Sequence, residues 1–161
     1  MKAHRVHVGE GASAVYAGLH RMSERAESAA LAAGITAGQI ELIKLRCSQI
    51  NGCAYCLEQH VRVAIEAGEP QARLSVLSAW RETEWFSAEE QAMLEVAETV
   101  TEIAQGPPDD EDYRRIVTTL GEEKYAAAFW VATVINSYNR VAITSHYHVG
   151  PEAARPIRNG S

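Results

Sequence analysis

Apolar residues recur at intervals of three and four along most of the chain, which is the spacing of helices that each bury one face. No segment alternates apolar and polar residues for long enough to predict a β-strand. We expect helices over about residues 12–33, 36–50, 53–68, 70–80, 87–104, 109–120 and 122–146. The pattern therefore predicts an all-α protein whose connecting loops have ordinary lengths.

Residue pairs typical of helix starts support these boundaries. Thr36 with Gln39, and Ser87 with Glu90, form capping boxes, in which each side chain satisfies a backbone N–H group of the other residue. The strongest break in the chain is Gly106-Pro107-Pro108, because these residues interrupt helices.

Two segments carry expectations about burial. One face of the first long helix is expected to point into the core, and it consists of Val15, Leu19, Met22, Ala26 and Ala29. The stretch of residues 126–135 is apolar on every side, so it is expected to lie either at the centre of the domain or against another subunit. We interpret three further residues as packing or interface residues, namely Trp80, Trp85 and Trp130.

Length and charge limit the classes of function. We expect one domain over residues 1–161, with its core at about 12–146 and a disordered tail at 150–161. The net charge of −6, without a stripe of Lys and Arg, argues against nucleic-acid binding. The longest uncharged stretch, residues 125–139, is too short to span a bilayer, and the first residues lack the apolar segment of a signal peptide. We therefore expect a cytoplasmic protein with no membrane partner.

The candidate chemistry lies in a Cys-x-x-Cys pair. The chain has 3 cysteines, an odd number at tight spacing, which argues against a secreted disulfide framework. Cys53 and Cys56 follow the turn at residues 51–52, where a new helix begins and its free N–H groups stabilise a thiolate. Around that helix Cys56 and His60 lie about 60° and about 20° from Cys53, so one face carries both sulfurs and the imidazole. His60 can exchange a proton with a thiol directly or through one water.

The residues alone leave redox chemistry, metal binding and an inert role open for this pair. In the metal interpretation Cys53, Cys56 and His60 supply three ligands, whereas a closed zinc site needs four. Glu41 could complete the set, although two thiolates, one imidazole and one carboxylate are an uncommon structural combination. Cys47 lies on an apolar helical face, and we interpret it as an inert buried cysteine.

The spacing Glu41-x11-Cys53-x2-Cys56-x3-His60 resembles the signature of alkylhydroperoxidase D-like proteins in the carboxymuconolactone decarboxylase superfamily. The segment of residues 135–140, Ile-Asn-Ser-Tyr-Asn-Arg, resembles a second recurring element of its short members, and the two together cover about residues 36–143. Arg140 in that segment could pair with an acid across the core or an interface. The resemblance implies a helical bundle that assembles into homotrimers or homohexamers.

The same resemblance implies a thiol peroxidase or disulfide oxidoreductase. Its substrate would be a peroxide or a disulfide, and an external dithiol or protein reductant would restore the thiols. Carried over by position, Glu41 and His60 relay a proton, Cys56 attacks the peroxide, and Cys53 is the resolving partner. No cofactor and no metal are expected.

One position departs from the family pattern. The best-characterised members have a second histidine inside the Cys-x-x-Cys, where this chain has Tyr55. A tyrosine hydroxyl does not titrate near neutral pH, so it donates a hydrogen bond but does not shuttle protons. The lactone decarboxylases of the superfamily generally lack the cysteine pair, which argues against decarboxylation. A decarboxylase-type lyase and a non-enzymatic metal-binding oligomer are the alternatives.

Overall fold

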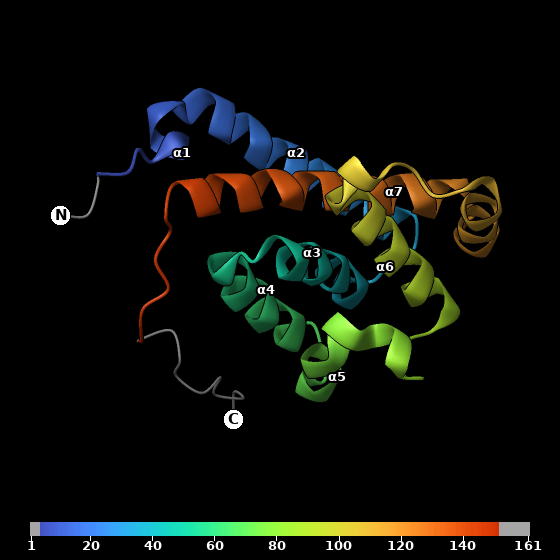
Figure 1. Ribbon diagram of the computed structural model, residues 1–161. Coiled ribbons are helices and arrows are strands. Elements are labelled where there is room, and N and C mark those ends of the chain that lie inside the picture. Colours follow the sequence, from blue (N-terminus) through green and yellow to red (C-terminus); the bar gives the residue numbers. More distant parts are fainter. Residues whose placement is uncertain (1–3, 152–161) are drawn as a thin grey trace.

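The computed structural model describes residues 4–151, and these residues form helices and no strand. This confirms the expected all-α class. The α-helices are α1 (Val8–Gly11), α2 (Ser13–Ala32), α3 (Ala37–Asn51), α4 (Ala54–Glu66), α5 (Gln71–Val76), α6 (Ala88–Thr101) and α7 (Asp110–Thr144), shown in Figure 1. Two 3₁₀ helices, η1 (Leu77–Glu82) and η2 (Ile103–Gln105), extend α5 and α6.

The helix boundaries follow the local signals in the sequence. Both capping boxes are present, with Thr36 and Ser87 each accepting a hydrogen bond from the backbone N–H three residues later. The expected helices over 109–120 and 122–146 meet at Gly121, whose φ of 75° and ψ of 157° interrupt α7. Glycine tolerates this left-handed φ because it lacks a Cβ atom. The short helix α1 was not expected from the sequence.

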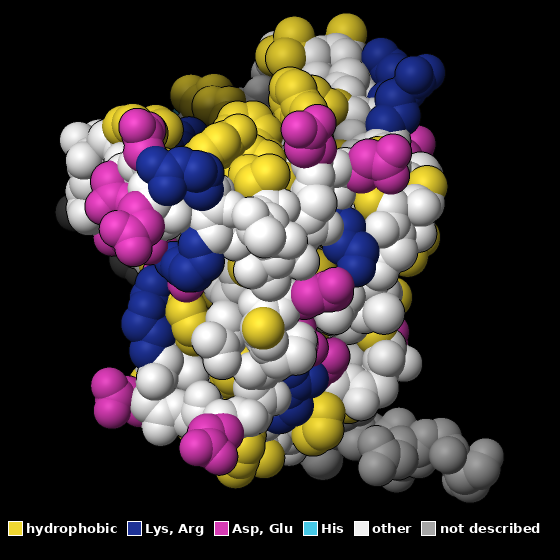
Figure 2. Space-filling view, turned by 90° about the vertical axis from the view of Figure 1, so that its right-hand side faces the viewer, with side chains coloured by type: hydrophobic (Ala, Val, Ile, Leu, Met, Phe, Trp, Pro, Cys, Tyr) yellow, Lys and Arg dark blue, Asp and Glu magenta, His cyan; other side chains and the backbone are white. Residues whose placement is uncertain are grey.

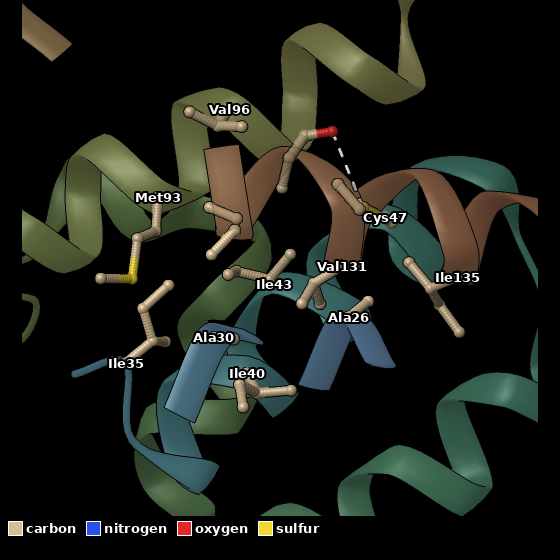
Figure 3. Close-up of a cluster of buried hydrophobic side chains, with 14 of the residues drawn as sticks. Ala26, Ala30, Ile35, Ile40, Ile43, Cys47, Met93, Val96, Val131 and Ile135 are labelled. Carbon is tan, nitrogen blue, oxygen red and sulfur yellow. Dashed lines mark hydrogen bonds between the residues drawn. The ribbon is translucent and has the colours of Figure 1, made fainter. Parts of the chain in front are cut away.

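The central element is α3, which is covered on both faces. Its Ile40, Ile43 and Cys47 enter a core cluster shared with α2, α6 and α7, part of which is drawn in Figure 3. Leu42 and Leu45 enter a second cluster built with side chains of α4, α5, η1 and α6. Because apolar contacts surround α3, any polar side chain on its buried part must find a partner inside the protein.

The long helix α7 joins the remaining layers. It packs against α2, α3 and α6, and Figure 1 shows its C-terminal half running between α2 on one side and α3 with α4 on the other. Within residues 4–151, no helix combines the length and apolar composition needed to cross a bilayer.

The burial expected for α2 is partly wrong. Ala26 and Ala30 are its buried residues, whereas Val15 is 75% exposed and Ala29 is exposed as well. Leu19 and Met22 pack against the core only in part. The reason is that α2 lies on the outside of α7 and approaches it closely through small side chains, so the face in contact is narrower than the apolar pattern predicts.

The stretch of residues 126–135 is buried on one face only. Ala128 and Val131 are in the core, but Phe129 is 38% exposed and Trp130 is 50% exposed. The other tryptophans differ from each other, since Trp80 is buried and Trp85 is 52% exposed. A central position in the fold therefore explains the apolar residues on the buried face of this stretch, but not those on its exposed face.

One face of the surface, drawn in Figure 2, mixes acidic and basic side chains over most of its area, while hydrophobic side chains gather at its upper end. The expected disorder of the tail at 150–161 lies, from residue 152 onward, outside the residues that the structure describes.

Candidate active site

The cysteine pair lies at the reversal between α3 and α4. Gly52 follows the end of α3 with φ 69° and ψ 35°, a left-handed conformation that lets the chain turn sharply. Cys53 is the N-cap residue of α4, so the pair occupies the first turn of a helix, where the sequence places it. Cys53 and Cys56 form a disulfide, and their Cα atoms are 5.4 Å apart.

Both cysteines are shielded from solvent. Cys53 is 1% exposed and Cys56 is 4% exposed, and they pack with Ala142 of α7 and with Tyr55 and Tyr147. The backbone N–H of Cys56 donates a hydrogen bond to Cys53 Sγ at 3.3 Å. The N-terminal end of α4 therefore directs a positive partial charge toward that sulfur.

Glu41 and His60 form a direct pair across the two helices. His60 Nδ1 lies 2.7 Å from Glu41 Oε2, because the turn folds α4 back alongside α3. Glu41 is only 4% exposed. An ionised carboxylate accepts hydrogen bonds only, so Nδ1 carries the proton, and Nε2 is left as the nitrogen that can take up a proton.

Lys44 extends this pair into a charged chain that the sequence analysis missed. Its Nζ donates to Glu41 Oε1 at 2.7 Å and to Glu27 Oε1 of α2 at 2.8 Å. Glu41 and Lys44 are one helical turn apart and are both buried. The signal that could have revealed Lys44 is its position three residues after Glu41 inside an otherwise apolar helix.

The surroundings of Glu41 keep its carboxyl ionised. Burial by itself would raise the pKa of this group, but the hydrogen bond from His60 and the charge of Lys44 outweigh burial and lower the pKa below its ordinary value. The carboxylate is thereby fixed as an acceptor for the imidazole over the neutral pH range.

A cavity of about 310 Å³ opens beside the disulfide. Cys56 and His60 both line it, whereas Cys53 does not. Much of the remaining wall is aromatic and comes from Tyr16, His20, Tyr55, Tyr138 and Tyr147. Tyr138 Oη lies 2.8 Å from His20 Nδ1. Burial and a hydrogen bond with Tyr147 raise the pKa of Tyr16 to about 12, so the Tyr16 hydroxyl stays protonated.

Apart from Tyr55, sequence reasoning missed this aromatic wall because its other residues come from distant segments. Tyr16 and His20 are on α2, Tyr138 is on α7, and Tyr147 follows the end of α7. No spacing within the chain relates them to the cysteine pair. Only the packing of α2 and α7 over the first turn of α4 brings them together.

The side chains considered as metal ligands are engaged with one another or with neighbouring side chains. Across residues 4–151, no three His, Cys, Asp or Glu side chains gather in a way that could hold a metal ion. The carboxylate of Glu41 is engaged by His60 and Lys44, and the two sulfurs are bonded to each other. These donors are therefore committed to partners inside the protein.

The contacts of Cys47 and Arg140, two other residues named in the sequence analysis, lie within the packed protein. Cys47 is buried, with Sγ 3.7 Å from the carbonyl oxygen of Ala97, and burial raises the pKa of its thiol to about 12. Within the described residues Arg140 does not pair with an acid across the core: its Nη1 donates to the backbone and side-chain oxygens of Asn136, and a pair across an interface stays a prediction. Arg140 caps a neighbouring amide on its own helix.

Residues 17–99, more than half of the chain, match the model of the carboxymuconolactone decarboxylase family. The chain belongs to this family, and its fold is that of the alkylhydroperoxidase D-like members. The family expected from the spacing of Glu41, the two cysteines and His60 is thereby confirmed.

The chain is also similar to two individual proteins. The uncharacterized protein YdfG of Bacillus subtilis (strain 168) is 42% identical over 103 residues, which are 64% of this chain and 70% of YdfG. A crystal structure from Agrobacterium tumefaciens superposes with a TM-score of 0.79 at 25% identity, covering 91% of this chain and 97% of that one. That protein is of unknown function and has been proposed to be an antioxidant defence protein, AhpD.

We expect Glu41→Gln to remove part of the pH dependence of stability. The lowered pKa means that the folded protein binds this proton less tightly than the unfolded chain does. The stabilisation is fully present above the ordinary pKa of 4.5 and is lost as the pH falls through the folded value. At neutral pH the substitution should cost about 1–3 kcal/mol, since it weakens a buried charged hydrogen bond.

The measurement is urea unfolding of the reduced protein at neutral pH and at acid pH. The difference in the free energy of unfolding between wild type and Glu41→Gln should be smaller at acid pH than at neutral pH. Glu66→Gln, an exposed glutamate at the end of α4, is the control and should leave both values unchanged. An equal loss at both pH values would contradict a charged role for Glu41.

Proposed function

We propose that this protein is a thiol-dependent peroxidase or disulfide oxidoreductase that works through Cys53 and Cys56. The observation that carries the proposal is that Cys56, part of a disulfide, shares a cavity with His60, whose imidazole is held by Glu41. A cysteine pair that can open and close, a base, and room for a substrate are the parts that such chemistry needs.

In the reduced protein, Cys56 is the thiol that attacks a peroxide, because its side chain lines the cavity. The thiolate sulfur bonds to the nearer peroxide oxygen, the O–O bond breaks, and the leaving oxygen takes up a proton. The sulfur becomes a sulfenic acid and the peroxide becomes an alcohol or water. The proton can come from the imidazole of His60.

Cys53 resolves this intermediate. Its thiol attacks the Cys56 sulfur, the disulfide forms, and one water leaves. A dithiol or a protein reductant then attacks Cys56 from the cavity, and Cys53 departs as the leaving thiolate. The N–H of Cys56, 3.3 Å from Cys53 Sγ, favours that departure because it stabilises negative charge on the sulfur.

Glu41 and His60 serve as the relay. Because Glu41 holds the Nδ1 proton of His60 at 2.7 Å, Nε2 can take a proton from Cys56 and return one to the leaving oxygen. Tyr55 stands where characterised members carry a second histidine, and it packs edge-on against Tyr147 with ring centroids 5.1 Å apart. His60 is then the one imidazole of this motif that moves protons.

A decarboxylase-type lyase is the alternative that the family name suggests. In such an enzyme the cysteine pair would be dispensable. The position of Cys56 in the cavity wall, next to a base, favours the thiol chemistry. A cycle that ends in reduction by a dithiol also favours a reducing compartment, the cytoplasm.

We also propose that the protein is a homo-oligomer, with trimer or hexamer as the expected state. Phe129 and Trp130 are adjacent on α7, their rings pack edge to face at 5.8 Å, and both are substantially exposed. Aromatic residues of this kind are enriched in protein interfaces. A second copy of the chain is the partner that fits the resemblance in the sequence.

Mild peroxide should convert the Cys53 and Cys56 thiols into a disulfide and leave Cys47 reduced. Titration of the unfolded protein should find two of 3 thiols lost, and mass spectrometry should locate the new bond. Cys47 is protected because its thiol is buried and its pKa is raised to about 12. A disulfide that includes Cys47, or no loss of thiols, would exclude the redox proposal, whereas turnover of a lactone by Cys56→Ser would favour the lyase.

His60→Ala and Glu41→Gln should each slow peroxide-driven oxidation of the thiols at neutral pH, by about 10²–10⁴-fold for His60→Ala. Both should lose less at high pH, where hydroxide supplies the thiolate. The double variant should be little worse than the poorer single variant, because the two residues act in one chain. Wild-type rates in both variants, with Glu66→Gln as the control, would make the pair structural.

Light scattering should give a multiple of the 17.6 kDa chain mass. Trp130→Glu should lower that mass, because a charge would be buried at the interface. Trp85→Glu is the matched comparison, because Trp85 is 52% exposed and Trp130 is 50% exposed, but Trp85 lies outside the Phe129–Trp130 pair on α7 to which the interface is assigned. A mass of 17.6 kDa for wild type over a wide concentration range would count against the oligomer.

A further inference from the structure

The segment of residues 135–140 contributes to a group of hydrogen-bonded polar side chains beside the cysteine turn. We call this group the amide network, and it consists of Ser48, Asn51, Thr101, Asn136 and Asn139. Its members come from the end of α3, the end of α6 and the middle of the second part of α7. Asn139 is 0% exposed, and Asn136 is 6% exposed.

Asn51 is the hub of the network. Its side-chain Nδ2 donates to Asn136 Oδ1 at 2.9 Å and to Asn139 Oδ1 at 2.8 Å. Asn136 in turn donates to Thr101 Oγ1 at 2.9 Å, and Asn139 donates to Ser48 Oγ at 3.0 Å. Asn136 and Asn139, which are both buried, thus each use the oxygen and the nitrogen of the side-chain amide, and this holds the group in one arrangement.

The network reaches the cysteine pair from two sides. Asn51 is the last residue of α3, separated from Cys53 only by Gly52. The backbone N–H of Cys53 donates to the carbonyl oxygen of Ser48 at 3.0 Å. On α7, Ala142 lies three residues after Asn139 and shares a buried cluster with both cysteines. The same helix therefore holds the turn through Asn51 and covers the sulfurs through Ala142.

We propose that Asn51, held by Asn136 and Asn139, is a positioning residue that sets the reduction potential of the Cys53–Cys56 pair. This inference rests on the proposed function, because it requires that the pair be reduced and reoxidised. The network consists of side chains whose hydrogen bonds do not involve the sulfurs, so it stays in place when the disulfide opens. It keeps the turn closed in the reduced protein.

A closed turn favours the disulfide over the dithiol. When the pair is reduced by dithiothreitol, the S–S bond takes up two electrons and two protons, and dithiothreitol becomes its cyclic disulfide. If the turn stays closed, the two thiols remain close together, and the intramolecular disulfide re-forms at a high effective concentration. Without the network the reduced turn gains freedom, and the equilibrium moves toward the dithiol.

The test measures the equilibrium between the protein and mixtures of reduced and oxidised dithiothreitol or glutathione. We expect Asn51→Ala to shift the equilibrium constant about tenfold toward the dithiol, which is a rise of about 30 mV in reduction potential for a two-electron couple. Asn139→Ala removes one acceptor for Asn51 and the contact with Ser48, and it should shift the constant in the same direction. If Asn51→Ala folds poorly, the Asn139→Ala variant tests the same proposal.

Val96→Ala is the matched control, because Val96 is a buried core residue of α6 that belongs neither to the network nor to the wall of the cavity beside the disulfide. It should lower the unfolding temperature and leave the equilibrium constant unchanged. If wild type cycles but both asparagine variants keep its equilibrium constant within twofold, or if Val96→Ala shifts that constant equally, the positioning role is wrong. If the wild-type disulfide cannot be reduced and re-formed at all, the proposed function fails and takes this inference with it.

Discussion

The burial of α3 on both faces is the constraint on which the candidate site depends. A carboxylate on such a helix loses its hydration, and it stays charged only if donors inside the protein replace the water. Glu41 has two such donors, His60 and Lys44, and Lys44 is itself paired with Glu27. The position of the imidazole is therefore set by the need of a buried charge for partners, and the same contacts aim the imidazole at the cavity.

The helix α7 also determines the geometry of the site. Apolar residues of this helix fill the main core, and polar residues on the same helix hold the turn between α3 and α4. The cysteine turn is thus held to α7 by hydrogen bonds, and beside it a cavity opens toward the aromatic wall to which α2 and α7 contribute. In the proposed thiol cycle, a turn held in this way keeps the two sulfurs close together, and the cavity beside Cys56 leaves space for different molecules to approach the same thiol in turn.

Much of the site could be predicted from the sequence because its parts are local. The Asn51-Gly52 turn, the cysteine pair in a first helical turn, and His60 on the same face all follow from helical spacing. Glu41 is on the preceding helix, and its pairing with His60 needs only that the turn fold one helix against the next. Tyr16, His20, Tyr138 and Tyr147 could not be found in this way, because they reach the site through packing between elements far apart in the chain.

By itself the sequence determined the helices, their caps and the chemistry of one turn, because hydrogen bonding within a helix and capping act over a few residues. Tertiary structure alone decided which apolar residues are buried. Val15 and Trp130 fit an apolar pattern and are exposed, because burial depends on which neighbours cover a helix and not on its own period. It also decided that Arg140 contacts an amide, and that Asn51 is bound to α7. These contacts join residues many positions apart, and no local rule relates them.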